Sequence, residues 1–446
     1  MPAEQVDEIV GQVRAAFERW RETGYEERAG LMRRAAEILR GGRDRYAGLI
    51  TAEMGKTIGE AEAEVEKCAL NCDFYAEHAA RFLADEPVET TAQESYVAFE
   101  PLGPILAIMP WNFPLWQVFR FAAPALIAGN TAVLKHASNV PQCALAIEEV
   151  FREAGFPEGA FRTLLIRGQE AEGLIADPRI AAATLTGSDA AGSRVAAAAG
   201  RALKKTVLEL GGSDPFIVLE DADLEAAAQV AAKARFQNAG QSCIAAKRFI
   251  VVDAVADRFE GLFKEAAEAL PVGDPTDRAT RMGPLARADL RDALEDQLAR
   301  SVAQGARVLT GGERRAGRGY FYPPTILTGV TDGMPAFREE TFGPLAAVIR
   351  VRDEAEALAC ANDSQYGLGG NIWSRDVERA KALARRVESG SVFINGMTAS
   401  NPRLPFGGVK RSGYGRELAS FGIREFVNIQ TIWVEKEPEA VQPPSE

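Results

Sequence analysis

The chain has 446 residues, 47% of them hydrophobic, which is too long for one ordinary core and predicts two or three domains. Its formal net charge of −12 argues against a nucleic-acid partner or an anionic membrane, because the phosphates of either would be repelled. The chain holds two histidines, which argues against a His-rich zinc site and a Ser-His-Asp triad. If the chain is an enzyme, we expect a carboxylate or a lysine as its base.

The amino-terminal segment and the most apolar segment predict neither export nor a membrane span. Residues 1–10 are acidic and polar, so no signal peptide is expected. The most apolar stretch, residues 121–134, is interrupted by Pro124, Gly129 and Asn130. The five cysteines are a sparse, odd-numbered set, which fits free thiols in a reducing compartment. We therefore expect a soluble, cytoplasmic protein.

The first part of the chain is predicted to be helical. Apolar residues recur at helical spacing over residues 6–20 and again over 31–49, and a further helix is expected over 56–78. Cys68 and Cys72 lie one turn apart in that third helix. Because no second pair of ligands lies nearby, we interpret both as packing residues and expect no metal site.

From about residue 101, short apolar strands alternate with Ala-rich helical segments. This alternation predicts right-handed βαβ crossovers and a largely parallel sheet covered by helices on both faces. Such sheets bind ligands at the carboxyl ends of their strands. A domain junction is expected near Gly211-Gly212 and Asp214-Pro215, followed by a second α/β set. The predicted strands are 105–109, 131–134, 163–166, 182–186, 207–210 and 216–218.

Two further extended segments are expected outside these sheets. The polar segment 86–100, which ends in Tyr96, Val97 and Phe99, suits a hairpin, and residues 426–433 suit a strand. Both are too exposed to remain unpaired on a monomer, so we expect assembly by backbone pairing. The charged, proline-containing end of the chain, residues 435–446, is predicted to be disordered.

Two segments are weak candidates for functional sites, one for phosphate binding and one for a reactive thiol. Thr186-Gly187-Ser188 follows a predicted strand and precedes a helix, an arrangement that lets a phosphate approach backbone N–H groups. The same turn is structurally routine and is not the GxGxxG fingerprint. Cys243 lies in a polar, Gly-containing turn, where it is either a reactive thiol or a packing residue, and this segment alone favours packing.

Two polar residues have equally open interpretations. Glu209 lies inside an apolar strand that runs into a double glycine, so its carboxylate is either paired or tuned as a general base. Asn112 lies in a loop between bulky residues and prolines, where it is either a turn cap or a donor to a developing oxyanion.

Taken together, these segments resemble the aldehyde dehydrogenase superfamily over nearly the whole chain. Finer details, in residues 135–138 and 401–406, resemble the short bacterial succinate-semialdehyde dehydrogenases. Seven motifs occur in the family's order: 109–114 (Met-Pro-Trp-Asn-Phe-Pro), Leu134-Lys135, Thr186-Gly187-Ser188, 208–212 (Leu-Glu-Leu-Gly-Gly), Gly240-Gln241-Ser242-Cys243, 340–344 (Glu-Thr-Phe-Gly-Pro) and Pro405-Phe406-Gly407-Gly408.

The resemblance implies a fold and a division of the chain. The fold is α/β, with a Rossmann-type cofactor domain, an α/β catalytic domain and a small β oligomerisation element that makes a homodimer or homotetramer. The implied division is 1–84 with 101–210 for the dinucleotide-binding domain, 211–415 for the catalytic domain, 85–100 with 424–434 for the oligomerisation strands, and 435–446 for the tail.

The resemblance also implies roles for catalytic residues. Cys243 would be the nucleophile and Glu209 the general base, while the Asn112 amide and the Cys243 backbone N–H would form the oxyanion hole. A thiolate that adds to an aldehyde gives a thiohemiacetal, which loses hydride to a nicotinamide and leaves a thioester. An activated water must then hydrolyse that thioester, which suits a desolvated carboxylate.

The cofactor implied is NADP or NAD. The resemblance places Trp111, Lys135, Gly187 and Ser188 near the adenosine and pyrophosphate, and Glu340 with Phe342 near the nicotinamide ribose. Relatives that favour NAD often carry Glu three residues after the lysine, where this chain has Ser138. Serine would not repel a 2′-phosphate and the lysine could attract it, so NADP is favoured.

The substrate implied is a small carboxylated aldehyde, above all succinate semialdehyde. The resemblance places Trp116 and Arg120 beside a substrate tunnel and Ser242 next to the nucleophile. Ser400, which lies shortly before Pro405-Phe406, is a further candidate contact to the carboxylate of the substrate. Arg120 could bind a carboxylate through two charge-assisted hydrogen bonds, or it could pair with an acidic side chain of the fold. The alternatives are another short aliphatic aldehyde, a coenzyme A-acylating dehydrogenase, against which Glu209 argues, and a non-catalytic binding protein.

Overall fold

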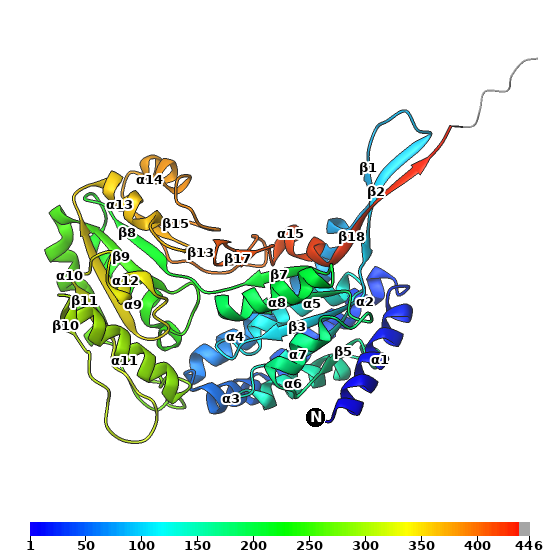
Figure 1. Cartoon of the computed structure of the whole chain (residues 1–446), viewed down its shortest axis with the longest axis horizontal. Helices are drawn as coiled ribbons and strands as arrows, with labels where there is room; N and C mark the ends of the chain where they lie inside the picture. Colours follow the sequence, from blue (N-terminus) through cyan, green and yellow to red (C-terminus); the bar gives the residue numbers. More distant parts are fainter. Residues whose placement is uncertain (437–446) are drawn as a thin grey trace, which may run out of the picture.

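The computed structural model describes residues 1–436 as two α/β lobes and a β arm that projects from one of them (Figure 1). The lobe that carries the amino terminus contains a six-stranded sheet, and the other lobe contains a seven-stranded sheet. The predicted α/β class with largely parallel sheets is confirmed. Of the predicted tail, residues 437–446 lie outside the described residues.

The six-stranded sheet has the order β17-β7-β6-β3-β4-β5 and is parallel apart from β17. Ile105 of the central β3 lies opposite Ala132 on one side and Ala182 on the other. The central strands β3, β4 and β6 are buried on both faces, which is why they form continuous apolar runs in the sequence. Their bounds are β3 (Pro104–Met109), β4 (Thr131–His136), β5 (Phe161–Thr163), β6 (Ala182–Thr186), β7 (Lys205–Glu209) and β17 (Gly413–Tyr414).

Helices from the first half of the chain surround this sheet. α5 lies deepest, and all 12 of its residues are buried although it contains Pro124. Its apolar side chains pack with those of α2 and α4 in one core. The helices are α1 (Ala3–Trp20), α2 (Tyr25–Gly41), α3 (Arg43–Met54), α4 (Ile58–Phe82), α5 (Trp116–Ile127), α6 (Pro141–Glu153), α7 (Gly168–Leu174) and α8 (Asp189–Arg201).

The seven-stranded sheet has the order β10-β11-β12-β9-β8-β14-β15 and is parallel apart from β10. A second core lies between its strands and the helices on its faces. The strands are β8 (Asp214–Val218), β9 (Ala246–Val252), β10 (Arg307–Thr310), β11 (Thr325–Thr328), β12 (Leu345–Val351), β14 (Asn371–Trp373) and β15 (Phe393–Ile394). The helices are α9 (Leu224–Phe236), α10 (Asp253–Glu268), α11 (Ala288–Ala303), α12 (Pro335–Arg338), α13 (Glu354–Asn362) and α14 (Val377–Ala384).

Short elements complete the chain. A two-stranded ladder joins β13 to β16, and a turn of 3-10 helix, η1, follows α9. No helix among residues 1–436 is both long and apolar enough to cross a membrane. The short elements are η1 (Gln237–Gly240), β13 (Tyr366–Gly367), β16 (Val409–Lys410), α15 (Ala419–Ile423) and η2 (Arg424–Phe426).

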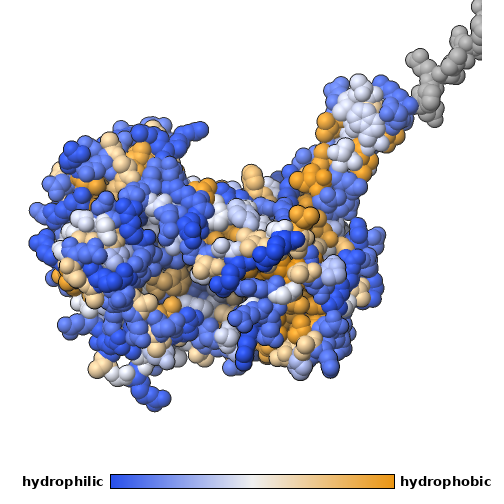
Figure 2. Space-filling view, in the orientation of Figure 1, coloured by the Kyte–Doolittle hydropathy of each residue, from blue (hydrophilic) through white to orange (hydrophobic). Residues whose placement is uncertain are grey.

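The projecting arm is a three-stranded antiparallel sheet of β1 (Glu86–Pro87), β2 (Glu94–Pro101) and β18 (Val427–Val434). β18 pairs with β2 along its whole length, so the two long strands pair with each other within the chain. β18 is nevertheless an edge strand, and Ile429 and Trp433 on it are 64% and 47% exposed. Apolar side chains are visible on the arm in Figure 2.

Two sequence predictions missed a boundary. The helical pattern over 31–49 is split at Gly42, since α2 ends at Gly41 and α3 begins at Arg43. The Tyr46 ring packs over Gly42, where an added Cβ atom would lie 2.5 Å from it. The strand expected at 163–166 instead ends at Thr163. Residues Leu164 and Ile166 are buried against α7, so their apolar character reports packing under a helix and not strand pairing.

Candidate active site

The two lobes approach each other closely at the double glycine that links β7 to β8. The Gly212 N–H donates to Glu340 Oε1 at 3.0 Å, and a Cβ atom on Gly211 would lie 2.5 Å from Glu340 Oε2. A Cβ atom on Gly212 would collide with the Cys243 carbonyl oxygen. Glycine is therefore required at position 212, where a side chain would push the Cys243 backbone away, whereas a side chain at position 211 would displace the Glu340 carboxylate.

The segment before Cys243 has a strained backbone. Asn238 and Ala239 adopt φ of 54° and 51°, the left-handed region that is unfavourable for alanine. Hydrogen bonds hold this turn in place. Asn238 donates its backbone N–H to Glu60 Oε1 at 3.0 Å and its side-chain amide to Asn112 O at 2.9 Å. The turn thereby fixes the nucleophile segment against the Asn112 loop.

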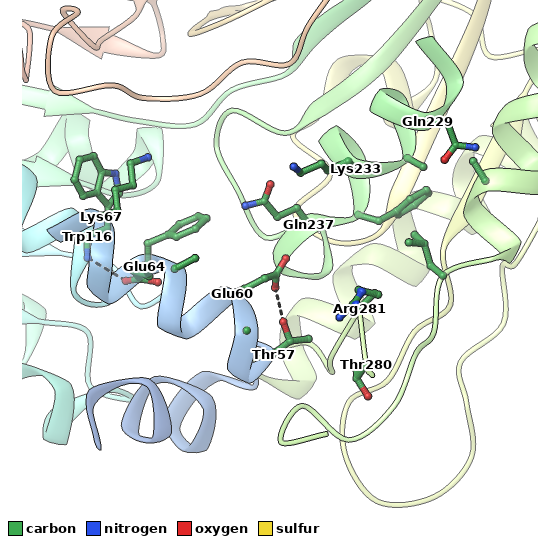
Figure 3. Close-up of a pocket in the computed structure, with 17 residues that line it drawn as sticks. Thr57, Glu60, Glu64, Lys67, Trp116, Gln229, Lys233, Gln237, Thr280 and Arg281 are labelled. Atoms are coloured by element: carbon green, nitrogen blue, oxygen red, sulfur yellow. Dashed lines mark hydrogen bonds between the residues drawn. The ribbon is translucent and has the colours of Figure 1, made fainter. Parts of the chain in front are cut away.

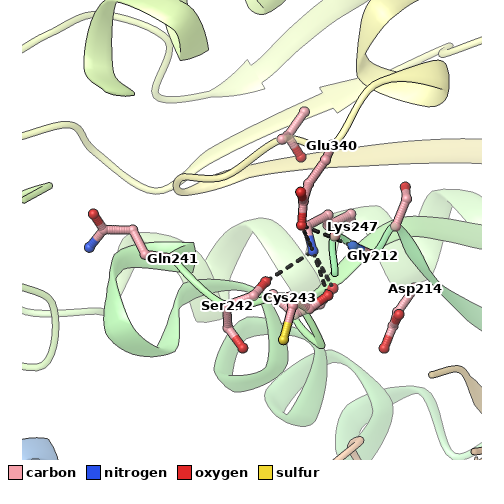
Figure 4. A network of polar contacts seen from close by, with 12 residues as sticks. Gly212, Asp214, Gln241, Ser242, Cys243, Lys247 and Glu340 are labelled. Atoms are coloured by element: carbon pink, nitrogen blue, oxygen red, sulfur yellow. Dashed lines mark hydrogen bonds and ion pairs between the residues drawn. The ribbon is translucent and has the colours of Figure 1, made fainter. Parts of the chain in front are cut away.

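Buried side chains hold the rest of the segment. The Gln241 side chain accepts a hydrogen bond from Ala286 N at 2.9 Å and donates to Asn238 O at 3.1 Å. Lys247 donates to the carbonyl oxygens of Ser242 at 3.0 Å and of Cys243 at 2.9 Å, and it lies 3.6 Å from Glu340 (Figure 4). The orientation of Cys243 is thus set by hydrogen bonds to its own backbone.

The Cys243 side chain is half-buried where two pockets meet. Burial raises the pKa of its thiol to about 12, although the positive charges of Arg120 and Lys247 act in the opposite direction. A thiol with such a pKa is almost entirely protonated at neutral pH, so it becomes a nucleophile only as its proton is removed.

One of these pockets is a cleft of about 370 Å³ that collects most of the residues expected to bind the cofactor. Ser188 caps the amino end of α8, where its hydroxyl accepts from Ala191 N at 3.3 Å, and Gly192 packs α8 closely against Leu210. Unpaired N–H groups and the helix dipole at this end suit a pyrophosphate. The predicted residues in the lining are Trp111, Asn112, Gly187, Ser188, Cys243, Glu340 and Phe342.

Ser138 lies elsewhere, in a hollow of about 590 Å³ between the ends of β4 and β5 and the start of α7. Lys135, on β4, does not line this hollow, and desolvation lowers its pKa. Arg167, which the sequence analysis did not single out, lines the same hollow as Ser138. The hollow thus holds an uncharged serine and a guanidinium, together with Glu170, whose carboxylate accepts from the Arg167 backbone N–H at 2.8 Å. The serine and the guanidinium fit a dinucleotide whose adenosine carries a 2′-phosphate.

The other pocket that reaches Cys243 is small, with a volume of about 100 Å³. It brings together with the thiol all four residues that were expected to contact the substrate. The rings of Phe113 and Phe406 contribute apolar surface. The predicted residues in its lining are Trp116, Arg120, Ser242 and Ser400.

Arg120 is buried and contacts other side chains of the protein. It is 2% exposed, forms an ion pair with the buried Glu417, and lies 4.5 Å from the centre of the Phe406 ring. It also donates to the Thr186 hydroxyl at 3.4 Å. The geometry therefore favours the alternative that the sequence left open, in which Arg120 pairs with an acidic side chain of the protein.

Glu209 ends β7 and is 2% exposed. Neither carboxylate oxygen has a hydrogen-bond partner among residues 1–436. Gly407 packs closely against the carboxylate, because an added Cβ atom there would lie 2.8 Å from Oε1. Burial raises the pKa of Glu209 well above its ordinary value, and the negative charge of Glu417 raises it further. Glu209 lines neither pocket that reaches Cys243, but its charge acts on the thiol and raises the pKa of Cys243.

Asn112 is 4% exposed and lines the cleft together with Cys243. Its amide donates to Gln241 O at 3.1 Å, which leaves the second amide hydrogen for another acceptor.

Sequence reasoning missed two lysines at this site. Lys247 lies within the apolar strand β9, and the criterion that singled out Glu209, a charged residue inside an apolar strand, would have found it. Lys67 lies on α4, lines the small pocket and donates to the Ser400 hydroxyl at 2.7 Å. No sequence signal marks Lys67, because a lysine on an amphipathic helix is ordinarily a solvated residue.

The fold and these pockets define a protein of the aldehyde-oxidising type, and the chain belongs to the aldehyde dehydrogenase family, whose model matches residues 1–432. The predicted family is thereby confirmed. A probable succinate-semialdehyde dehydrogenase of the NADP(+) type from Synechocystis sp. is 56% identical over 418 residues, which cover 94% of this chain and 92% of that one.

Two further relatives agree. A succinate semialdehyde dehydrogenase of the NAD(P)+ type from Escherichia coli is 51% identical and covers 97% of this chain and 94% of its own. The crystal structure of succinic semialdehyde dehydrogenase from Streptococcus pyogenes in complex with NADP+ superposes with a TM-score of 0.96 at 42% identity, over 98% of this chain and 96% of that chain.

Proposed function

We propose that this chain oxidises succinate semialdehyde to succinate, with NADP as the preferred hydride acceptor and NAD as a second one. The observation that carries the proposal is the position of the Cys243 thiol at the junction of a cofactor-sized cleft and a small pocket. Relatives at 51–56% identity with succinate-semialdehyde dehydrogenase names support the substrate.

The proposed reaction begins when the Cys243 thiol transfers its proton to water and the resulting thiolate adds to the aldehyde carbon. The negative charge that develops on the aldehyde oxygen is stabilised by the Asn112 amide and the Cys243 backbone N–H. A dinucleotide held in the cleft by Trp111, Gly187, Ser188, Glu340 and Phe342 would supply the hydride acceptor. Loss of hydride from the thiohemiacetal would leave a thioester on Cys243.

Hydrolysis of the thioester is assigned to Glu209. A carboxylate with a raised pKa is a stronger base than an ordinary one, so it can take a proton from water as the oxygen attacks the thioester carbon. The thiolate leaves, the acid is released, and the proton passes to solvent. A coenzyme A-acylating enzyme would need no such base, which is why we favour the hydrolytic reaction.

The remaining roles are also proposals. Trp111, Gly187, Ser188, Glu340 and Phe342 would hold the dinucleotide in the cleft, and Lys135 with Ser138 would meet its adenosine end. Trp116, Ser242 and Ser400 would line the substrate pocket, as would Arg120. The implied domain boundaries, with 1–84 and 101–210 as the cofactor domain and 211–415 as the catalytic domain, also stay predictions.

A panel of aldehydes tests the function. The full chain is assayed with succinate semialdehyde and butanal, with NADP or NAD, and with or without coenzyme A, while absorbance of the reduced nicotinamide is followed. We expect turnover without coenzyme A and a higher kcat/KM for succinate semialdehyde. Strict dependence on coenzyme A, or folded protein that is inactive with every aldehyde, would refute the proposal.

We further propose that the protein is cytoplasmic and assembles as a homodimer or homotetramer through the arm. The exposed edge of β18 supports assembly, because an open strand edge invites backbone pairing with a second copy. Light scattering at micromolar concentration tests this, and a monomer mass would contradict it.

A further inference from the structure

Two carboxylates near the start of α4 take no part in the proposed chemistry. Glu60 and Glu64 are one helical turn apart, and both line an outer pocket of about 650 Å³ that residues of α4 and α9 surround (Figure 3). Each accepts hydrogen bonds from backbone N–H groups of a segment that carries a predicted catalytic residue. Their side chains therefore connect α4 to both segments of the candidate active site.

Glu64 holds the loop that carries Asn112. Its Oε1 atom accepts from the N–H groups of Leu115 at 2.9 Å and Trp116 at 3.0 Å, which lie at the start of α5. The first N–H groups of a helix lack partners within the helix, and its dipole favours a negative charge there. Asn112 lies only three residues before Leu115, so Glu64 fixes the position of the loop against α4.

A buried cation holds Glu64 in turn. Lys56 forms an ion pair with the other oxygen of Glu64, and the two side chains are 0% and 2% exposed. The Lys56 ammonium also lies 3.7 Å from the centre of the ring of Phe113, which follows Asn112 in the chain. The pair therefore contacts the Asn112 loop both through its backbone and through an aromatic side chain.

Glu60 holds the turn that precedes Cys243. One carboxylate oxygen accepts from Asn238 N at 3.0 Å and the other from Thr57 Oγ1 at 3.1 Å. Burial raises the pKa of Glu60, and the hydrogen bond from Asn238 N acts in the opposite direction because it favours the carboxylate. Asn238 and Ala239 adopt φ of 54° and 51°, so the turn is strained and depends on contacts from outside itself.

The two segments that α4 holds also contact each other. The Asn238 amide donates to Asn112 O at 2.9 Å, and the Asn112 amide donates to Gln241 O at 3.1 Å. Gln241 lies two residues before Cys243, whose backbone N–H is the second proposed donor to the oxyanion. α4 therefore contacts both segments, and their own hydrogen bonds join them to each other.

We propose that Glu60 and Glu64 are positioning residues that set the spacing between the two oxyanion donors, the Asn112 amide and the Cys243 backbone N–H. This inference rests on the proposed function and adds to it the residues that hold the reactive geometry. A developing oxyanion must lie about 2.7–3.1 Å from its donors, and a misplacement of about 1 Å can slow a reaction about a hundredfold. Each glutamate acts only through the backbone that it holds.

Variants of Glu60 test the first contact. Glu60→Met removes the acceptor of the Asn238 N–H, whereas Glu60→Gln keeps a side-chain oxygen for it. We expect Glu60→Met to lower kcat about tenfold or more, with KM and the Kd for NADP, measured by protein fluorescence, changed less than about threefold. Glu60→Gln should recover most of the lost kcat. Because Lys56 pairs with Glu64, neither variant leaves a buried cation unpaired.

Glu53 supplies a matched control. This carboxylate on α3 accepts from Gln142 N at 2.8 Å and Cys143 N at 2.9 Å, so it caps the start of α6 as Glu64 caps α5. It lines neither pocket that reaches Cys243. Glu53→Met should therefore lower the midpoint of thermal unfolding and leave kcat within about twofold of the wild-type value.

A double-mutant cycle tests the second contact. Lys56→Met/Glu64→Met removes both members of the buried pair, so no unpaired charge remains. If Glu64 acts through Asn112, we expect this change to slow hydride transfer about tenfold in wild type and less than about threefold in the Asn112→Ala background. The rate of hydride transfer is measured in a single turnover, as the first appearance of reduced nicotinamide.

Any of four results would overturn the inference and leave the proposed function in place. These are a wild-type kcat in Glu60→Met, no recovery in Glu60→Gln, an equal fall of kcat in Glu53→Met, and a full additive loss in the Asn112→Ala background. If Lys56→Met/Glu64→Met does not fold, the Glu60 and Glu53 variants decide alone. A folded wild type that is inactive with every aldehyde would overturn the proposed function, and the inference with it.

Discussion

Replacing Arg120 with methionine separates a structural role from substrate binding. Arg120 and Glu417 are 2% and 5% exposed, and Glu209 is buried close enough for the charge of Glu417 to raise its pKa. Removing the guanidinium leaves two buried carboxyl groups without their cation. Removing one partner of a buried ion pair costs about 3–5 kcal/mol. The pKa of Glu417 is already raised by burial, so protonation limits the loss and we expect about 3 kcal/mol.

The assay is urea unfolding of Arg120→Met, Glu417→Gln and the double variant, followed by circular dichroism. Because the double variant leaves no uncompensated charge from this pair, it should be more stable than the sum of the single losses predicts, by about 1 kcal/mol or more. The kcat/KM of Arg120→Met should fall in parallel for succinate semialdehyde and butanal. Unchanged stability together with a loss confined to succinate semialdehyde would refute this reasoning and make Arg120 the carboxylate contact.

Three further results are expected. Cys243→Ala should abolish turnover, whereas Glu209→Gln should give a burst of reduced cofactor followed by slow steady turnover; a normal steady rate in either variant removes its assigned role. Ser138→Glu should raise the KM for NADP relative to NAD through repulsion of the 2′-phosphate, and a wild type strongly selective for NAD would contradict the NADP preference. Iodoacetamide should alkylate Cys243 of the cofactor-free protein about tenfold faster per pH unit between pH 7 and 10, because its pKa is raised to about 12; Cys243→Ser gives the background rate, and a plateau below pH 9 would contradict that pKa.

The sequence by itself determined the family, the α/β class and most strands of the first sheet. Strands β3, β4, β6 and β7 are buried on both faces, so continuous apolar runs predicted them to within two residues. The prediction of a strand at 163–166 was wrong because a buried apolar run that packs under a helix has the same composition as a buried strand. The sequence marks Glu209 as a charged residue in an apolar strand, Asn112 as an amide between bulky residues and prolines, and Cys243 as a thiol in a polar turn.

Only the tertiary structure decided which charges are already paired. Arg120 and Lys67 are both cations on helices, and nothing local distinguishes one paired with a carboxylate from one hydrogen-bonded to a hydroxyl. Glu417 follows Arg120 by nearly three hundred residues and Ser400 follows Lys67 by 333, so their contacts exist only once α4, α5 and the carboxyl-terminal loops pack around Cys243. An ion pair depends on distance in space, and a linear pattern carries no information about separations of that length.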